Sequence, residues 1–199
     1  RYEKQFQNMT TAIIEEREMR FQSVDVFARL IEDRILFVHS IDGGWSNVYQ
    51  AQLLFLESTE PSKDISMYIN MPGGGITNGL GIYDSMQVIS SDISTICTGL
   101  AASMGAVLLA AGSKGKRSAL RHARVMIHQP IGAIGGQASN IEIYTNLVRD
   151  FKNDIYKILA DHTGKTTEQI EKDSDRDFWM TTDQAKEYGI IDEVILQRK

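Results

Sequence analysis

One serine stands where nucleophilic chemistry is favoured. Ser103 lies in the small-residue run 101–106, between a predicted strand over 93–97 and a predicted helix over 107–111. A hydroxyl at such a junction lies near the unpaired N–H groups and the positive end of the helix, which also stabilise an oxyanion. The run fits a nucleophile elbow, with Ala101 at the position of the first glycine. A serine that only caps the helix is the alternative.

A serine nucleophile needs a base, and the chain holds four histidines. His128 directly follows a predicted strand over 125–127, so we expect it at the carboxyl edge of a sheet, where it is the best-placed general base. A histidine with a structural hydrogen bond is the alternative there. The other three are expected in a polar turn, at a helix end, and after the first strand: His122, His162 and His39.

Composition cannot identify the carboxylate that would orient the histidine, because the chain has 26 acidic residues. Three aspartates lie in a charged turn before the aromatic run 178–180: Asp173, Asp175 and Asp177. No metal site is expected, since the histidines lack H-E-x-x-H spacing and a single cysteine excludes a thiolate cluster. A paired-carboxylate mechanism has no recognisable framework either.

A glycine-rich run, Pro-Gly-Gly-Gly over 72–75, follows a predicted strand over 65–69. Ligand sites form at the carboxyl ends of parallel strands. Glycine N–H groups beside a helix start bind an anion, either a phosphate or a reaction oxyanion. Phosphate is disfavoured because the run fits neither G-x-x-x-x-G-K-[ST] nor G-x-G-x-x-G. A tight turn that needs positive φ is the structural alternative.

Three successive strand–helix steps are predicted to position these residues. The strands are expected over 34–38, 65–69 and 93–97, and the helices over 45–57, 80–86 and 107–111. This order is typical of an α/β fold with a mostly parallel sheet covered by helices. The first of these helices is predicted from four apolar residues at helical spacing: Val48, Ala51, Leu54 and Phe55.

A long helix is predicted over 139–160, after a glycine-rich span over 132–136 and before a C-terminal cap over 162–164. Its apolar stripe comprises Ile141, Leu147, Val148, Phe151, Ile155 and Ile158. A short helix over 182–188 and a last strand over 190–196 follow. The one basic cluster is expected to form a solvated hairpin: Lys114, Lys116, Arg117, Arg121 and Arg124.

The composition is that of an ordinary globular protein. The 199 residues are 42% hydrophobic and 24% charged, with a net charge of −5 that argues against a nucleic-acid partner. One domain is expected, with residues 1–20 as a peripheral arm or short helix. The longest apolar stretch, 106–111, is too short for a bilayer, and no signal peptide is recognisable, so we expect a cytoplasmic location. Cys97 is expected to be a buried filler.

From about residue 25 onward, the chain resembles the ClpP peptidase family, the proteolytic subunits of the Clp protease. The resemblance rests on several ordered motifs, at 51–57, 69–74, 82–84, 101–106, 111–117, 124–130, 136–139 and 175–180. It implies a serine endopeptidase in which Ser103 is the nucleophile, His128 the general base and Asp177 the orienting acid. It also implies that the backbone N–H groups of Gly74 and Met104 form the oxyanion hole.

The family resemblance further implies how substrate and partner subunits bind. Unfolded polypeptide would add as a β-strand along four residues: Ile76, Pro130, Ile131 and Gly132. Asp175 and Arg176 would pair between two stacked heptameric rings, made of this chain alone or with a paralogue. An unfoldase ring of the ClpX or ClpA type would dock on this tetradecamer and use the ATP. No cofactor, metal, nucleic acid or membrane is implied for this subunit.

The fold implied by the resemblance is a crotonase-like spiral of ββα units with a protruding handle of about 131–161. Residues 1–20 would form the axial pore region and 21–199 a single peptidase domain. The chain departs from the usual family pattern at Met71, at Leu100, and in the segments 13–18 and 40–45. Two alternatives stay open: an acyl-CoA hydratase or isomerase of the same superfamily, and a non-catalytic ring subunit, against which the intact triad argues.

Overall fold

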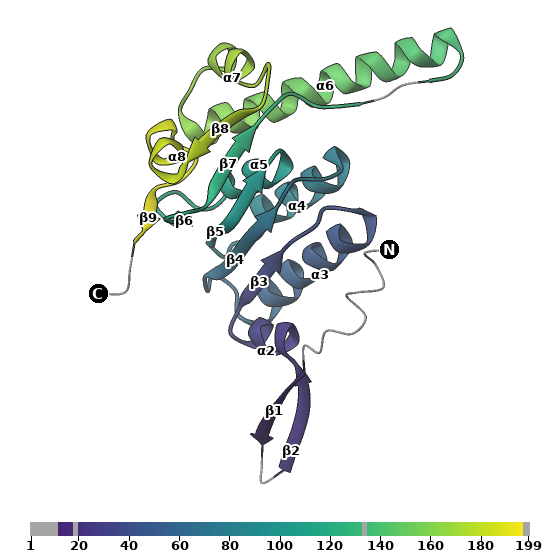
Figure 1. Ribbon diagram of the computed structural model, residues 1–199. Coiled ribbons are helices and arrows are strands. Elements are labelled where there is room, and N and C mark those ends of the chain that lie inside the picture. Colours follow the sequence, from purple (N-terminus) through teal and green to yellow (C-terminus); the bar gives the residue numbers. More distant parts are fainter. Residues whose placement is uncertain (1–11, 18–19, 133–134, 197–199) are drawn as a thin grey trace.

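The protein has a mixed α/β fold built around one seven-stranded sheet (Figure 1). The structure, a computed structural model, describes residues 12–17, 20–132 and 135–196. The strands of the sheet are β3 (Ile35–Val38), β4 (Ile65–Met71), β5 (Ile93–Ala102), β6 (Arg117–Leu120), β7 (Arg124–Ile127), β8 (Phe178–Thr181) and β9 (Glu193–Ile195). The helices are α2 (Val26–Glu32), α3 (Gly43–Thr59), α4 (Ile76–Val88), α5 (Met104–Ala110), α6 (Ala138–Thr163), α7 (Thr167–Asp173) and α8 (Thr182–Tyr188).

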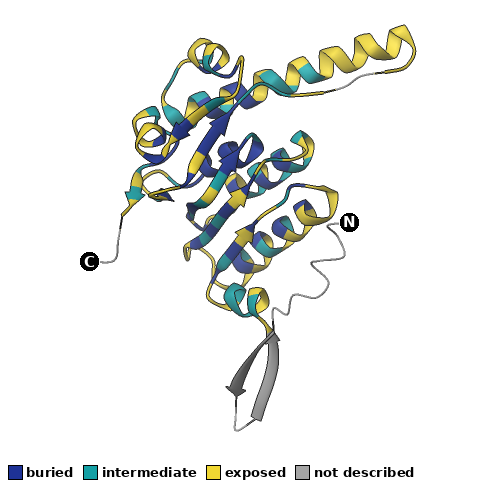
Figure 2. Ribbon diagram, in the orientation of Figure 1, coloured by how far each residue is buried: buried dark blue, intermediate teal, exposed yellow. Residues whose placement is uncertain are grey.

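The sheet is mostly parallel, as the strand–helix order predicts. Strands β3, β4, β5, β6 and β9 lie in that order with parallel pairing. β7 also pairs with β5 in parallel, whereas β8 pairs with β7 antiparallel. Parallel strands are covered on their faces by the helices that connect them, so their side chains are largely buried. Figure 2 shows this interior, where β4, β5 and α5 are largely buried.

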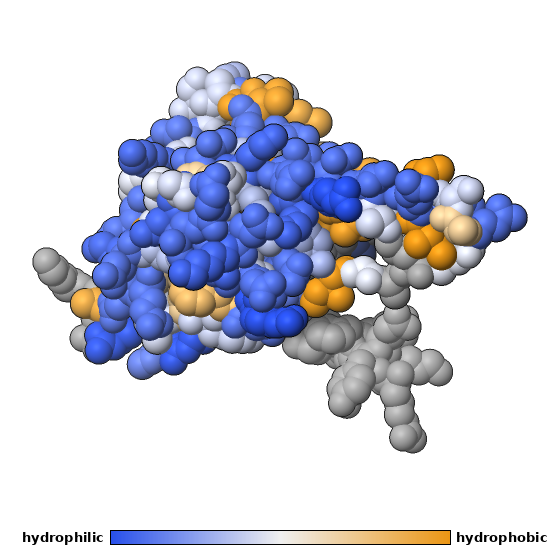
Figure 3. Space-filling view, turned by 90° about the horizontal axis from the view of Figure 1, so that it is seen from above, coloured by the Kyte–Doolittle hydropathy of each residue, from blue (hydrophilic) through white to orange (hydrophobic). Residues whose placement is uncertain are grey.

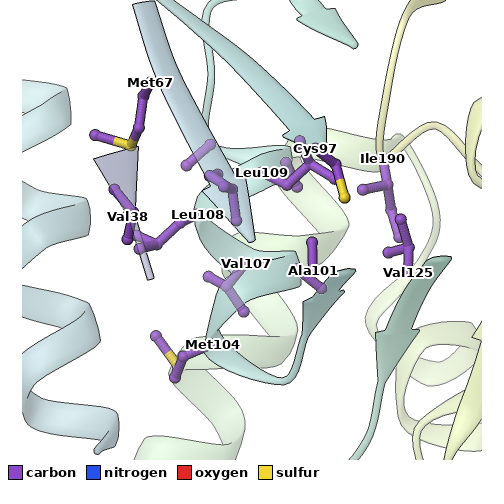
Figure 4. Close-up of a cluster of buried hydrophobic side chains, with 14 of the residues drawn as sticks. Val38, Met67, Cys97, Ala101, Met104, Val107, Leu108, Leu109, Val125 and Ile190 are labelled. Carbon is purple, nitrogen blue, oxygen red and sulfur yellow. The ribbon is translucent and has the colours of Figure 1, made fainter. Parts of the chain in front are cut away.

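Helix α5 lies in the middle of the core. All seven of its residues are buried, including Leu108 and Leu109, which are fully inaccessible. A short helix that is apolar on every side is stable only when it is surrounded by other elements. Figure 4 shows these residues in one cluster with side chains from the neighbouring strands, among them Val38, Met67 and Cys97. Cys97 is therefore a buried core residue, as predicted.

Strand β5 changes partners along its length. Its first half, Thr95 to Cys97, pairs with β6, and its last residues, Leu100 to Ala102, pair with β7. A register irregularity between β4 and β5 lies at this point, where the side-chain oxygen of Asn70 accepts a hydrogen bond from the Leu100 amide at 3.1 Å. The last residues of β5 thus pair with β7, the strand that His128 directly follows.

Helix α3 is confirmed, but the apolar residues that predict it do not face the core. Val48, Leu54 and Phe55 are exposed, while Tyr49 and Leu53 are buried against the sheet. The apolar residues at helical spacing therefore lie on the face of α3 that is exposed in this subunit. This exposed apolar face, together with Trp45, is unusual for an isolated subunit.

Helix α6 projects beyond the rest of the molecule (Figure 1). Only its last third carries buried residues, Ile155, Tyr156 and Leu159, and it ends at Gly164 in the left-handed conformation, as the predicted cap requires. Its first half carries exposed apolar side chains: Ile141, Ile143, Tyr144 and Leu147. Figure 3 shows hydrophobic side chains on this projecting arm.

The predicted basic hairpin is wrong. β6 pairs with β5 and β9, and Arg117 is buried instead of solvated. Its guanidinium donates to both carboxylate oxygens of Asp192, at 2.6 and 2.9 Å, and to the carbonyl oxygens of Ala110 and His162, at 3.3 and 2.8 Å. A buried arginine is tolerated because these acceptors satisfy it. It joins the ends of α5 and α6 to the sheet.

Other elements differ from the sequence prediction at the edges of the fold. Part of the N-terminal arm forms a strand, β1 (Ala12–Arg17), which pairs antiparallel with β2 (Arg20–Asp25) instead of forming a helix. Residues 1–11 and 18–19 of that arm lie outside the described residues. The helix α7 and the strand β8 are not predicted. No helix among the described residues is long and apolar enough to cross a bilayer.

Candidate active site

Strand register brings three of the predicted site residues together. Ser103 directly follows β5, and His128 directly follows β7, which is the parallel neighbour of the last part of β5. Asp177 directly precedes β8, which runs antiparallel to β7, with Phe178 opposite Ile127. The ends of two parallel strands and the start of an antiparallel one therefore meet at a single edge of the sheet.

Ser103 has a backbone conformation that non-glycine residues seldom adopt, with φ of 55° and ψ of −125°. Its amide donates to the Met126 carbonyl oxygen at 2.9 Å, which fixes the turn against β7. Ser103 occupies the N-cap position of α5, but its side chain makes no capping hydrogen bond. The hydroxyl instead lies 2.9 Å from Nε2 of His128. The simple capping role is therefore not what this serine performs.

The opposite side of the His128 ring faces a carboxylate. Nδ1 of His128 lies 3.1 Å from Oδ1 of Asp177. The histidine side chain is only 14% exposed, whereas that of Asp177 is 58% exposed. With the proton on Nδ1, the ring donates to Asp177 and its Nε2 accepts from Ser103. The three side chains thus form one row of hydrogen bonds from hydroxyl to carboxylate.

The other two candidate aspartates lie elsewhere. Asp173 accepts a hydrogen bond from the Tyr188 hydroxyl at 2.8 Å, away from His128. Asp175 is exposed and is held by Gln129, whose side-chain amide donates to the Asp175 carbonyl oxygen at 2.8 Å. The backbone amide of Gln129 also donates, to the Ser174 carbonyl oxygen of the same turn. Gln129 therefore ties the turn before Asp177 to the strand that carries His128, a contact whose only sequence signal is adjacency to the histidine.

The glycine run lies directly against the serine. A Cβ at Gly73, where φ is +114°, would lie 2.7 Å from Cβ of Ser103. The next residue, Gly74, forms a parallel bridge with Ile41, and the Gly75 amide donates to the Ile41 carbonyl oxygen at 3.0 Å. This close approach, together with the positive φ, explains why glycine occupies these positions. Sequence reasoning did not identify Ile41 as a neighbour of this loop.

A cavity of about 210 Å³ opens beside the serine and histidine. Of the residues expected to contact substrate, Ile76, Pro130 and Ile131 line it, and Gly132 does not. Gly74 and Met104 line it as well. Its remaining wall is apolar and comes from the glycine run, α5, β7 and α6: Pro72, Val107, Ile127, Ile155 and Leu159. Such a wall accepts an apolar side chain.

Of the other three histidines, His122 is exposed in the turn between β6 and β7, as predicted, and two contact tyrosine hydroxyls. His39 pairs with the Tyr49 hydroxyl at 2.7 Å, and His162 lies 3.2 Å from the Tyr83 hydroxyl. Burial, followed by the nearby charge of Arg117, lowers the pKa of His162. Across the described part of the chain, no three His, Cys, Asp or Glu side chains gather as metal ligands would.

Comparison of the chain with known proteins identifies its family. A profile of Clp proteases matches residues 16–198. The chain belongs to the Clp protease family. A Bacteroides fragilis protein named ATP-dependent Clp protease proteolytic subunit is 57% identical over 187 residues, which are 94% of this chain and 90% of that protein. Subunits of the same name from Bacteroides thetaiotaomicron and Porphyromonas gingivalis are 56% and 55% identical, over 94% of this chain and 85% of each relative.

Proposed function

We propose that this chain is a serine endopeptidase subunit of an ATP-dependent Clp protease. One observation carries the proposal: the hydroxyl of Ser103, on a constrained strand-to-helix turn, is hydrogen-bonded to Nε2 of His128, whose Nδ1 faces Asp177. A nucleophile, a base and an orienting acid in this order are the elements of acyl transfer. The family membership makes a peptide bond the expected substrate.

Each residue of the row has a distinct part in the proposed reaction. His128 takes the proton of Ser103 as the hydroxyl oxygen attacks the peptide carbonyl carbon, and then delivers that proton to the leaving amine. Water, deprotonated by His128 in turn, hydrolyses the acyl-enzyme ester and frees the serine. Asp177 holds the ring in the required tautomer and stabilises the imidazolium that forms at each step.

The oxyanion would be stabilised by two backbone amides. The Met104 amide lies in the first turn of α5, where N–H groups have no partner within the helix. Gly74 lines the same cavity as Met104, and the hydrogen bond to the Ile41 carbonyl oxygen comes from the Gly75 amide, not from that of Gly74. Removal of one such donor typically lowers the rate by about a hundredfold or more.

The cavity supports a preference for apolar side chains next to the cleaved bond. The extended segment at Pro130 and Ile131 and the start of α4 at Ile76 flank the cavity, and with Gly132 they would hold the substrate backbone as an added strand. Recognition through the backbone explains how unfolded polypeptides of many sequences would be accepted. The wall formed by Val107 and Leu159 would then receive one side chain.

Exposed apolar faces support assembly into rings. The outer face of α3, with Val48, Leu54 and Phe55, and the first half of α6, with Ile141 and Tyr144, would be covered by other subunits. We infer a crotonase-like spiral in which 21–199 form one domain, 1–20 an axial arm and about 131–161 a handle joining two heptameric rings. The exposed side chains of Asp175 and Arg176 would pair between the rings. A partner unfoldase would use the ATP, and this subunit would need no cofactor.

Active-site labelling of the purified chain tests the proposal. Wild type should react with a fluorophosphonate probe, hydrolyse a peptide with an apolar residue before the cleaved bond, and elute as an assembly larger than a single ring. Ser103→Ala should lose both labelling and hydrolysis without a change in assembly size. Ser62→Ala, at an exposed serine in the turn between α3 and β4, is the matched control and should keep both. Labelling that survives in Ser103→Ala would contradict the assignment.

A further inference from the structure

Gly74, the proposed oxyanion donor, packs directly against the backbone of Ile41, which precedes α3. A Cβ at Gly74 would overlap the Ile41 carbonyl oxygen and would lie 2.6 Å from the Ile41 Cβ. The bridge between the two residues and the hydrogen bond from the Gly75 amide to Ile41 fix the direction of the glycine peptides. Any shift of Ile41 therefore moves the peptide that carries the Gly74 amide.

Side-chain hydrogen bonds hold the chain on both sides of Ile41. Before it, the Tyr49 hydroxyl lies 2.7 Å from Nδ1 of His39 and accepts from the His39 amide at 3.3 Å. After it, Oδ1 of Asp42 accepts from the Gly44 and Trp45 amides, each at 2.9 Å. Both anchors belong to α3: Tyr49 is a buried residue of this helix and Asp42 is its N-cap.

The two anchors differ from ordinary packing contacts. Tyr49 is almost completely buried, so its hydroxyl is fixed, and Trp45 stacks on its ring with centroids 5.8 Å apart. Hydrogen bonds from the Trp45 and Gly44 amides lower the pKa of Asp42. α3 is in turn joined to α4, the helix after the glycine run, by a hydrogen bond from the Ser46 hydroxyl to the Asn78 carbonyl oxygen at 2.8 Å.

We propose that residues 39–42 form a strut that aims the oxyanion hole, with Asp42 and Tyr49 as its positioning residues. Neither side chain lines the cavity beside Ser103. They act through Ile41, whose backbone sets the Gly74 peptide. The inference rests on the proposed function, because it assigns these residues to the same reaction. Loss of either anchor should weaken stabilisation of the tetrahedral intermediate and leave ground-state substrate binding nearly unchanged.

Two substitutions with matched controls test the strut. Asp42→Ala and Tyr49→Phe should each lower kcat for peptide hydrolysis by about tenfold or more, with KM changed less than about twofold, because small displacements of catalytic dipoles cost large factors in rate. The rate of fluorophosphonate labelling should fall in parallel. Asp42→Asn keeps the capping acceptor and should restore most of kcat.

The controls remove the same groups elsewhere. Asp25→Ala deletes the N-cap of α2, whose carboxylate accepts from two amides, and Tyr83→Phe deletes a hydroxyl paired with His162. Both should keep kcat within about twofold of wild type while costing comparable stability. If Asp42→Ala and Tyr49→Phe also keep full kcat, or lose activity only as they unfold, the strut is refuted while the proposed function stands. A wild type that neither labels nor hydrolyses peptide would refute the proposed function itself.

Discussion

Replacing Gly73 with alanine should damage catalysis far more than folding. Gly73 has φ of +114°, and a Cβ there would lie 2.7 Å from Cβ of Ser103 and 3.1 Å from the Ala102 carbonyl oxygen. The positive φ alone costs an L-residue about 1–2 kcal/mol wherever it occurs. The overlap with Ser103 is a separate effect, because it is relieved only when Ser103 or the glycine run moves.

The required displacement sets the expected loss of rate. Two carbon atoms reach ordinary contact near 3.5 Å, so the Gly73→Ala side chain and Ser103 must separate by roughly 0.8 Å. A misplacement of about 1 Å at reacting groups costs roughly a hundredfold in rate, which corresponds to about 2.7 kcal/mol of transition-state stabilisation. We therefore expect kcat for peptide hydrolysis to fall by roughly 30- to 100-fold.

Gly115→Ala is the matched control. Gly115 also has a positive φ, +86°, but a Cβ there meets nothing within 4 Å, and the residue lies away from the cavity. Both variants should lose similar stability in urea unfolding, whereas only Gly73→Ala should lose kcat. Equal peptidase activity of the two variants, measured on preparations of the same assembly size, would refute the reasoning.

Two further predictions concern stability. Arg117→Met should lower the free energy of unfolding by about 3 kcal/mol, because it leaves the Asp192 carboxylate without its buried partner. Urea unfolding should show this loss beside the control Lys116→Met, which removes a partly exposed ion pair and should cost less. Hydrogen bonds from Ser90 and Ser91 lower the pKa of Glu57 from 4.5 to about 2. The stability they add is present above pH 4.5 and is lost as pH falls toward 2, so Glu57→Gln should destabilise at pH 7 and differ less from wild type at pH 3.

Ser103 and His128 are the residues of the candidate site that are easiest to predict from the sequence. Small residues around Ser103 and the strand before His128 mark two strand ends, and parallel strand ends meet at one edge of a sheet. The choice of Asp177 among three aspartates depends on the family resemblance, because β8 is only four residues long and carries no periodic pattern. Its antiparallel pairing with β7, which brings Asp177 beside His128, is a long-range contact that no local signal encodes.

Burial is predicted less well than secondary structure, for a physical reason. The apolar spacing of α3 indicates a helix correctly, but the face it marks is exposed, since Val48 and Phe55 point away from the sheet. A pattern records which residues avoid water and does not distinguish a subunit's own core from a face that another subunit would cover. Arg117 shows the converse: a charged residue predicted at the surface is buried because acceptors distant in sequence, such as Asp192 and the His162 carbonyl, satisfy it.

The departure at Met71 illustrates how the core supports the site. Met71 is buried beside α5, and a Cβ at Gly105 would lie 2.9 Å from its Cγ. The side chain therefore fills the space that a glycine leaves in the helix that follows Ser103. A bulky residue at this position of the glycine run is accommodated inward, away from the cavity, so the departure leaves the site geometry intact.

The alignment of Ser103 with His128 depends on an irregularity in the sheet. Between the pairs Ile69–Cys97 and Met71–Ala101, β4 advances by two residues while β5 advances by four. This extra length lets β5 leave β6 and join β7, and a bulge of this kind re-aims the strand that contains it. At the irregularity, the Leu100 amide donates its hydrogen bond to the side-chain oxygen of Asn70. A regular β5 would remain beside β6, and its end would not reach β7, the strand that His128 follows.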